Sequence, residues 1–126
     1  MAEGGKCKSA QTTCMKKYVK IYIDSMGYDT SDVIPCEICG AVAVDIMHIF
    51  PKGSGGSYIM DFVENLAAGC RRCHEKYGDK EHLRRHVVER HEEAMQIRGY
   101  TYRKWLIDLM KVSNKSRIVK AITDNG

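Results

Sequence analysis

Two short stretches, Cys36-Glu-Ile-Cys39 and Cys70-Arg-Arg-Cys73, decide how this chain is expected to fold. Two residues between paired cysteines let both sulfurs turn toward one ion, and two such turns complete a shell of four thiolates. That shell is the usual structural zinc site. The sequence therefore predicts a structural Zn²⁺ held by these four cysteines, and the ion would supply much of the folding free energy of a small core.

A redox role for one of the pairs is the main alternative to zinc. Neither pair opens a helix within a βαβ pattern, which is where a thioredoxin-like pair would stand. Cys7 and Cys14 lie outside the pairs, and we expect them to be free thiols. Residues 1–11 carry charge with no apolar stretch behind them, so we expect no secretory signal and a cytoplasmic location, where disulfides are rare.

The composition indicates one globular domain over residues 1–126. With 44% hydrophobic and 29% charged residues the chain resembles ordinary folded proteins, and 126 residues suit a single core. No apolar run approaches the roughly 18–20 residues that a membrane helix needs, so we expect no membrane partner.

The net charge of +4 is unevenly distributed along the chain. Residues 1–69 hold 6 Lys+Arg and 8 Asp+Glu, whereas residues 70–126 hold 14 and 8. A basic half is typical of a protein that binds a polyanion, although a solvated helical surface can have the same composition.

Hydrophobic periodicity and the positions of glycines divide the chain into helices and strands. We expect an N-terminal helix over 14–27, a helix from Arg71 to a break at Gly78, and basic C-terminal helices within 79–111, of which the first has Asp79 as its cap. Two strands are expected, over 41–50 and 65–69, with a glycine-rich loop over 51–57 between them. This order predicts an α+β fold, and the residues after Ser113 give no clear prediction.

An ordered set of residues lies between and around the cysteine pairs. It consists of His48-Ile49-x-Pro51, then Asn65-Leu66, then Cys70-x-x-Cys73-His74-x-Lys76, with His74 nine positions after Asn65. Over residues 36–77 this set resembles the HNH endonuclease family in its zinc-knuckle form. The resemblance implies a small ββα-metal (His-Me finger) core, flanked here by the N-terminal and C-terminal helices.

The resemblance also implies an activity and a role for each residue. It implies metal-dependent hydrolysis of DNA phosphodiester bonds, as nicking, by a small stand-alone enzyme of bacteria and their phages, in the cytoplasm of the bacterial host. By resemblance His48 is the general base, His74 is a metal ligand, and Asn65 either ligates the metal or holds the loop that bears the base. The chemistry of hydrolysis agrees with these roles. Cleavage of a phosphodiester needs a base and a cation, which can be Mg²⁺ or Mn²⁺ or another divalent ion. A neutral imidazole is suited to act as the base.

One position departs from the family pattern. The residue before the base is Asp or His in the family and ligates the metal, but here it is Met47, whose thioether is too soft for Mg²⁺ or Mn²⁺. Asp45 can reach the metal instead, since it shares a strand face with Met47, although it lies about 6–7 Å further along. Alternatively Asn65 and His74 hold the ion alone, or the site is impaired and the protein binds nucleic acid but cuts poorly.

Basic residues of the second half supply the expected DNA contacts. Arg71 and Arg72 stand on the helix of His74, which the resemblance places beside the minor groove, so they are natural phosphate contacts. His82, His86 and His91 show no metal-ligand pattern and are expected to lie on the surface or to pack between helices. The predicted nucleic-acid contacts are Lys52, Arg71, Arg72, Lys76, Arg84 and Arg85.

Three classes of function stay open at this point. The first is the nuclease, as a monomer that nicks or as a homodimer. The second is a zinc-stabilised nucleic-acid-binding protein with little or no catalysis. The third is a zinc-bearing protein–protein adaptor, for which the basic half has no evident use.

Overall fold

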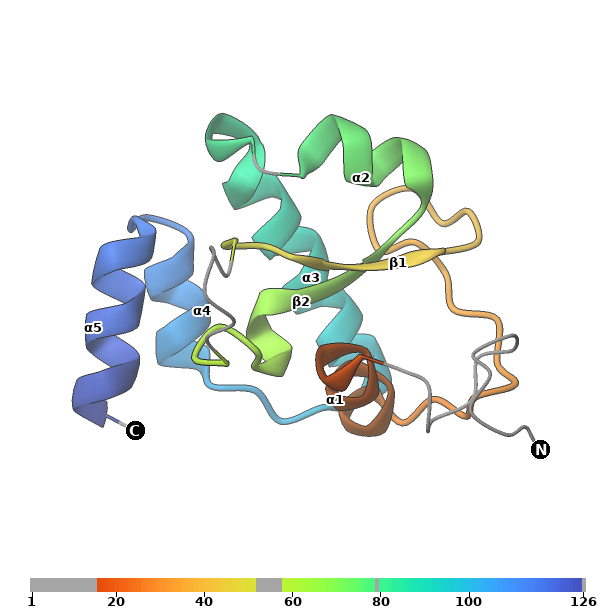
Figure 1. The fold of residues 1–126 in the computed structure, drawn as a ribbon, viewed down its shortest axis with the longest axis horizontal. Helices are drawn as coiled ribbons and strands as arrows, with labels where there is room; N and C mark the ends of the chain where they lie inside the picture. Colours follow the sequence, from red (N-terminus) through yellow and green to blue (C-terminus); the bar gives the residue numbers. More distant parts are fainter. Residues whose placement is uncertain (1–15, 52–57, 79, 126) are drawn as a thin grey trace.

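A computed structural model describes residues 16–51, 58–78 and 80–125 of the chain (Figure 1). The fold is α+β, as predicted, with a small two-stranded sheet among helices. The helices are α1 (Lys17–Met26), α2 (Arg71–Tyr77), α3 (Arg84–Arg98), α4 (Lys104–Met110) and α5 (Lys115–Asn125). The strands are β1 (Asp45–His48) and β2 (Leu66–Gly69), and two 3-10 helices, η2 (Val63–Asn65) and η3 (Glu81–Leu83), precede β2 and α3.

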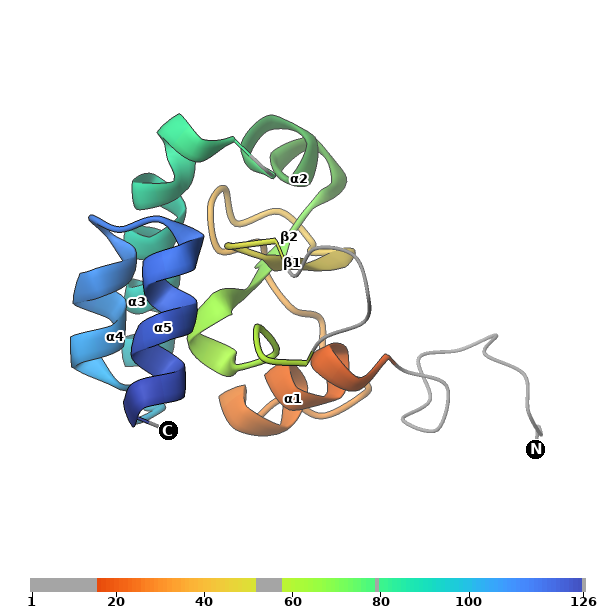
Figure 2. The same ribbon diagram turned by 60° about the vertical axis from the view of Figure 1, so that its left-hand side comes forward.

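The two strands form an antiparallel hairpin that separates two helices. Asp45 pairs with Gly69 and His48 pairs with Leu66. Because successive side chains of a strand point to opposite faces, Asp45 and Met47 share one face of β1, and Ile46 and His48 share the other. Figures 1 and 2 show α2 on one side of the hairpin and α1 on the other, so each face of β1 has its own helix.

Helix α1 forms where the apolar periodicity predicts it. Tyr22, Ile23 and Met26 are buried, and they recur at the spacing of one helix face. Gly27 ends the helix with φ of 77°, a left-handed conformation that favours glycine. The predicted first residues of this helix, 14 and 15, lie outside the described residues.

Strand β1 is shorter than the predicted 41–50. The backbone turns back immediately after the first cysteine pair, where Cys36 N–H donates to Ala41 O at 2.6 Å and Gly40 has φ of 84°. Ala43 then pairs with Ile34 instead of β2, with Ala43 N–H donating to Ile34 O at 2.8 Å. The β-branched residues of this segment fit an extended backbone, but the tight turn commits Val42 and Ala43 to a local bridge with the residues before Cys36.

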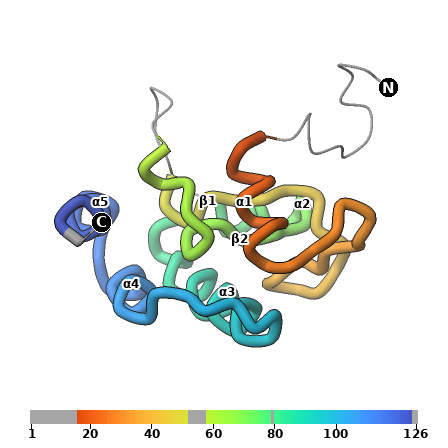
Figure 3. The backbone as a smooth tube through the Cα atoms, turned by 90° about the horizontal axis from the view of Figure 1, so that it is seen from below, coloured from red at the N-terminus to blue at the C-terminus, as the bar shows by residue number. Residues whose placement is uncertain are grey.

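From residue 84 onward the described chain forms three α-helices in succession. Helix α3 begins at Arg84, later than the predicted residue 79, because η3 comes first; the predicted cap, Asp79, lies outside the described residues. Gly99 ends α3 with φ of 75°. Seen from below in Figure 3, α3, α4 and α5 follow one another across the molecule, with α5 at its outer edge. Helix α5 had no sequence prediction, and its Ile118 is fully buried.

One hydrophobic core joins the hairpin to the helices. It contains residues from β2, the loop after β1, and α1, α3, α4 and α5. Its fully buried members include Phe50, Met60, Leu66, Ala67, Ala68, Val88, Met95, Leu106, Ile107 and Ile118. In the described part of the chain, no helix combines the length and apolar character needed to cross a membrane.

Candidate functional site

The four paired cysteines come together as the sequence predicts. Their sulfur atoms all lie within 4.8 Å of one another, and Cys39 Sγ is 3.6 Å from Cys70 Sγ. Tetrahedral zinc with Zn–S bonds of about 2.3 Å would separate its sulfurs by about 3.8 Å. The cluster of Cys36, Cys39, Cys70 and Cys73 can therefore hold a metal ion such as zinc.

Backbone N–H groups stabilise the thiolate form of two of these cysteines. The N–H of Cys73 donates to Cys70 Sγ at 3.4 Å, and this bond lowers the pKa of the Cys70 thiol. Burial raises the pKa of Cys36, but N–H groups from Cys39, Cys70 and Ile38 outweigh it and lower that pKa to about 7. Burial and the neighbouring thiols raise the pKa of Cys73. Since the thiolate is the metal ligand, each of the two cysteine turns has one cysteine, Cys36 or Cys70, whose surroundings favour metal binding.

A buried polar network anchors the first cysteine turn. Glu37, between Cys36 and Cys39, has a side chain only 3% exposed and accepts a hydrogen bond from Tyr22 of α1. His91 of α3 is fully buried, with Nδ1 2.7 Å from Glu37 Oε1 and Nε2 2.7 Å from Val63 O. Both partners are acceptors, so both ring nitrogens donate, as in an imidazolium. Burial lowers the pKa of His91, but the Glu37 carboxylate outweighs it and raises that pKa. Sequence reasoning assigned His91 a surface or packing role; the structure shows a buried ionic partner.

His48, the predicted base, lies on the α1 face of β1. Its Nε2 is 2.7 Å from Asp61 Oδ1, and its ring centroid is 4.5 Å from that of Tyr18. The side chains of His48 and Asp61 are 13% and 2% exposed. One ring nitrogen is thus held by a buried carboxylate, a partner that the sequence reasoning missed.

Asn65 fixes the loop that follows His48. It is fully buried; its Oδ1 accepts the N–H of Phe50 at 2.7 Å, and its Nδ2 donates to Phe50 O and Met60 O at 3.0 Å each. Of the two roles the resemblance allows, this geometry is that of loop-holding. Its oxygen accepts a backbone hydrogen bond inside the core, and Asn65 does not line the pocket that contains His74.

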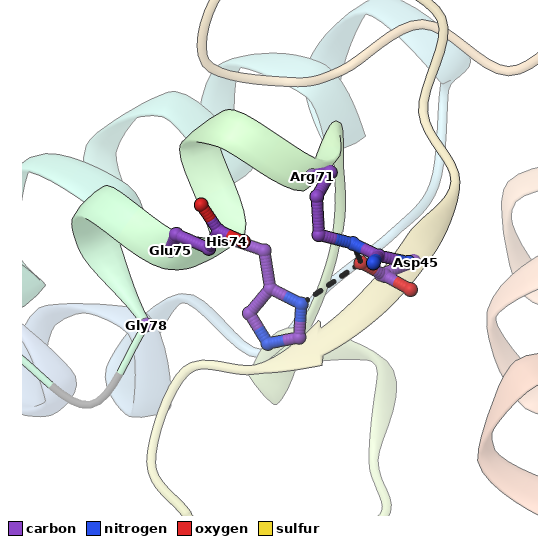
Figure 4. Close-up of a pocket in the computed structure, with 5 residues that line it drawn as sticks. All are labelled: Asp45, Arg71, His74, Glu75 and Gly78. Carbon is purple, nitrogen blue, oxygen red and sulfur yellow. Dashed lines mark hydrogen bonds and ion pairs between the residues drawn. The ribbon is translucent and has the colours of Figure 1, made fainter.

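Asp45 and His74 meet on the opposite, α2 face of the hairpin. Asp45 Oδ2 lies 3.0 Å from His74 Nδ1 and 3.3 Å from Arg71 Nε (Figure 4). With Glu75 and Gly78 these residues line a pocket of about 420 Å³. The hydrogen bond from His74 and the charge of Arg71 hold the pKa of Asp45 below its usual value despite partial burial. A carboxylate and an imidazole are suitable ligands for a divalent cation.

Met47, which precedes His48 in β1, is buried inside the protein. It is 3% exposed and packs on Gly69, where an added Cβ would lie 2.9 Å from the Met47 sulfur. Met47 and His48 border a narrow space that Gly78 also lines, and Gly78 borders the Asp45–His74 pocket as well. The end of β1 therefore adjoins the open pocket at Gly78.

Most of the side chains predicted to contact DNA are exposed, but Arg84 makes contacts within the protein. Arg71, Arg72 and Lys76 are exposed along α2, and Arg85 is exposed on α3, where it pairs with Glu89 at 3.2 Å. Arg84 is half-buried, its Nε donating to Ile49 O at 3.2 Å and its guanidinium stacking 4.4 Å from the Phe50 ring. Its first role is thus to pack on the loop after β1. Lys52 lies outside the described residues.

Comparison of the chain with known protein families, with curated proteins and with solved structures finds no match.

Proposed function

We propose that this chain is a metal-dependent endonuclease that hydrolyses DNA phosphodiester bonds by nicking, with a structural zinc at the four cysteines. The observation that carries the proposal is the 3.0 Å approach of Asp45 Oδ2 to His74 Nδ1 in an open pocket. These two side chains come from a strand and a helix whose sequence resembles the HNH family, and the pocket adjoins the end of the strand that bears His48.

In this proposal the two chemical tasks meet at Gly78, which borders both the pocket of Asp45 and His74 and the narrow space beside His48. His48 takes a proton from the attacking water, while Asp45 and His74 would hold the divalent ion. Such an ion would neutralise charge on the phosphate and on the leaving oxygen. Arg71 and Arg72 bind neighbouring phosphates, because both are exposed on the helix that carries His74. The partner is DNA, and the proposed location is the cytoplasm of a bacterial host.

Among the three accounts of Met47, the contacts favour Asp45 as the replacement ligand. Asn65 is engaged in three hydrogen bonds inside the core, so it does not join His74 in the pocket. Asp45 is 26% exposed and lies against His74, so the two side chains can share an ion once the proton between them is released.

The test is nicking of supercoiled plasmid with and without Mg²⁺ or Mn²⁺. We expect ion-dependent nicking that falls by about 10²–10⁴-fold in His48→Ala, the usual contribution of a general base. Asp45→Asn and His74→Ala should raise the ion concentration needed for half-maximal rate. Asp108→Asn, at an exposed position on α4, is the matched control and should nick as the wild type does. Equal nicking by wild type and His48→Ala would assign the activity to a contaminant.

A nucleic-acid-binding protein with little or no catalysis is the second candidate. The buried, apolar Met47 favours it, because this side chain offers the pocket no hard ligand. Met47→His should raise nicking if the missing ligand limits the rate. If the wild type binds DNA in a salt-dependent manner but neither protein nicks with Mg²⁺, Mn²⁺ or Ni²⁺, the second candidate replaces the first.

A further inference from the structure

The carboxylate of Asp61 lies against the proposed base in an arrangement that the endonuclease proposal does not itself require. Asp61 Oδ1 is 2.7 Å from His48 Nε2, and Asp61 stands 13 residues further along the chain. Asp61 is 2% exposed, whereas His48 retains 13% exposure. The carboxylate is thus inside the protein and the imidazole lies at its boundary.

The hydrogen bond to Asp61 decides which ring nitrogen of His48 carries the proton. A neutral imidazole has one N–H donor and one acceptor nitrogen, and a carboxylate oxygen can only accept. The Nε2 atom at 2.7 Å must therefore be the N–H nitrogen, which leaves the lone pair on Nδ1. The Tyr18 ring, 4.5 Å from the imidazole ring and tilted by 58°, restricts rotation that would exchange the two nitrogens.

We propose that Asp61 is a positioning residue that holds His48 in the Nε2–H tautomer, so that Nδ1 is the atom that accepts the proton of the attacking water. This inference rests on the proposed nuclease function for its catalytic consequence, but not for its geometry. A base oriented by a third group is a recurring arrangement in hydrolytic sites.

The proposed step balances as a hydrolysis. One O–H bond of water breaks and its proton moves to His48 Nδ1, while the water oxygen forms a bond to phosphorus. The bond from phosphorus to the leaving oxygen breaks, and that oxygen keeps the electron pair and takes a proton from solvent. His48 becomes an imidazolium that donates from Nε2 to the Asp61 carboxylate, and it then returns its Nδ1 proton to solvent.

The decisive measurement is ¹⁵N NMR of the His48 ring in the zinc-loaded protein, which distinguishes a protonated nitrogen from one with a lone pair. We expect Nε2–H in the wild type and in Asp108→Asn, and a mixture of both tautomers in Asp61→Asn, whose amide can also donate to Nε2. A wild-type ring protonated at Nδ1, or an Asp61→Asn ring with an unchanged tautomer, would overturn the proposal.

Kinetics add a second, separate readout. Asp61→Asn should lower kcat for plasmid nicking by about 10- to 100-fold, the usual effect of losing a group that orients a functional histidine. KM should not change, since the buried carboxylate does not touch DNA, and thermal unfolding reports any loss of folded protein. Asp61→Ala serves if the Asn variant does not fold. Unchanged kcat with an altered tautomer would overturn the catalytic part. Absence of nicking in the wild type with the expected tautomer would instead remove the nuclease function and leave the geometric assignment standing.

Discussion

The two faces of strand β1 carry similar residue types in opposite states. On the α1 face, His48 and Asp61 form a pair at 2.7 Å with 13% and 2% exposure. On the α2 face, His74 and Asp45 form a pair at 3.0 Å with 44% and 26% exposure. Each pair is a histidine with an aspartate, but the protein surrounds only the first.

This difference indicates what each pair can do. The closed pair has its geometry fixed by protein atoms, as a proton acceptor requires. The open pair keeps room for a third participant, and an exposed ion pair is itself worth little stability. We therefore expect variants of the closed pair to lower the rate of the proposed hydrolysis, and variants of the open pair to weaken ion binding.

Removal of zinc should disrupt both the closed pair and the open pair. The cysteine cluster joins the turn before β1 to the start of α2, and structural zinc contributes about 10–16 kcal/mol of apparent binding energy in small zinc domains. A chelator or Cys73→Ser should unfold both faces together, as seen by circular dichroism and loss of dispersed amide signals. A folded metal-free protein that retains the His48–Asp61 contact would show that the hairpin does not depend on the ion.

Asn65→Ala should destabilise the region around the closed pair and leave the open pair intact. It would leave the N–H and C=O of Phe50 and the carbonyl of Met60 unpaired inside the core, at a cost of about 2–4 kcal/mol in the free energy of unfolding. Urea denaturation measures this loss. Asn114→Ala, which removes the exposed cap of α5, is the control and should cost about 1 kcal/mol. Equal losses in the two variants would contradict the role given to Asn65.

Arg71→Ala combined with Arg72→Ala should weaken DNA binding and leave folding intact. Two fewer phosphate contacts reduce the slope of log K against log salt by about 2. The loss should be similar for all DNA sequences, because phosphates carry no base identity. Binding isotherms at several salt concentrations test this, with Lys120→Ala on α5 as the control. A loss restricted to one target sequence would indicate base recognition by this helix.

Asp45→Asn should have only a small effect on stability. The Asp45–His74 contact is partly exposed, so its removal should change the free energy of unfolding by less than about 1 kcal/mol. Titration of the zinc-loaded protein with Mn²⁺ should nevertheless show a clear loss of affinity at the open pocket. Unfolding of this variant would mean that the open pair is structural, and unchanged Mn²⁺ binding would place the ion elsewhere.

The sequence was sufficient for contacts that follow a local spacing rule. The two cysteine pairs predicted the four-sulfur cluster, and the apolar stripe of Tyr22, Ile23 and Met26 predicted the buried face of α1. The predicted strand over 41–50 was too long. A run of β-branched residues does not reveal that the turn at the first cysteine pair directs the first part of the segment away from β2. Helix α5 was missed because its polar surface masks a short apolar stripe.

Contacts between distant polar residues were not predictable in the same way. Asp61 follows His48 by 13 residues, so no helix or strand periodicity links them. Glu37 and His91 are 54 residues apart, and each is a residue type that is common at the protein surface. Pairings of this kind depend on the closed core, and only the three-dimensional structure reveals them.

The Glu37–His91 bond also has a consequence for the order in which the protein folds during its synthesis. A ribosome adds about 5–20 residues per second, so His91 is synthesised about 3–11 s after Glu37. During that interval the first cysteine turn has no cation to neutralise the carboxylate at its centre. The nascent chain therefore cannot complete the environment of this turn until α3 has been synthesised. Early zinc capture would precede docking of the C-terminal half, which locks the turn in place.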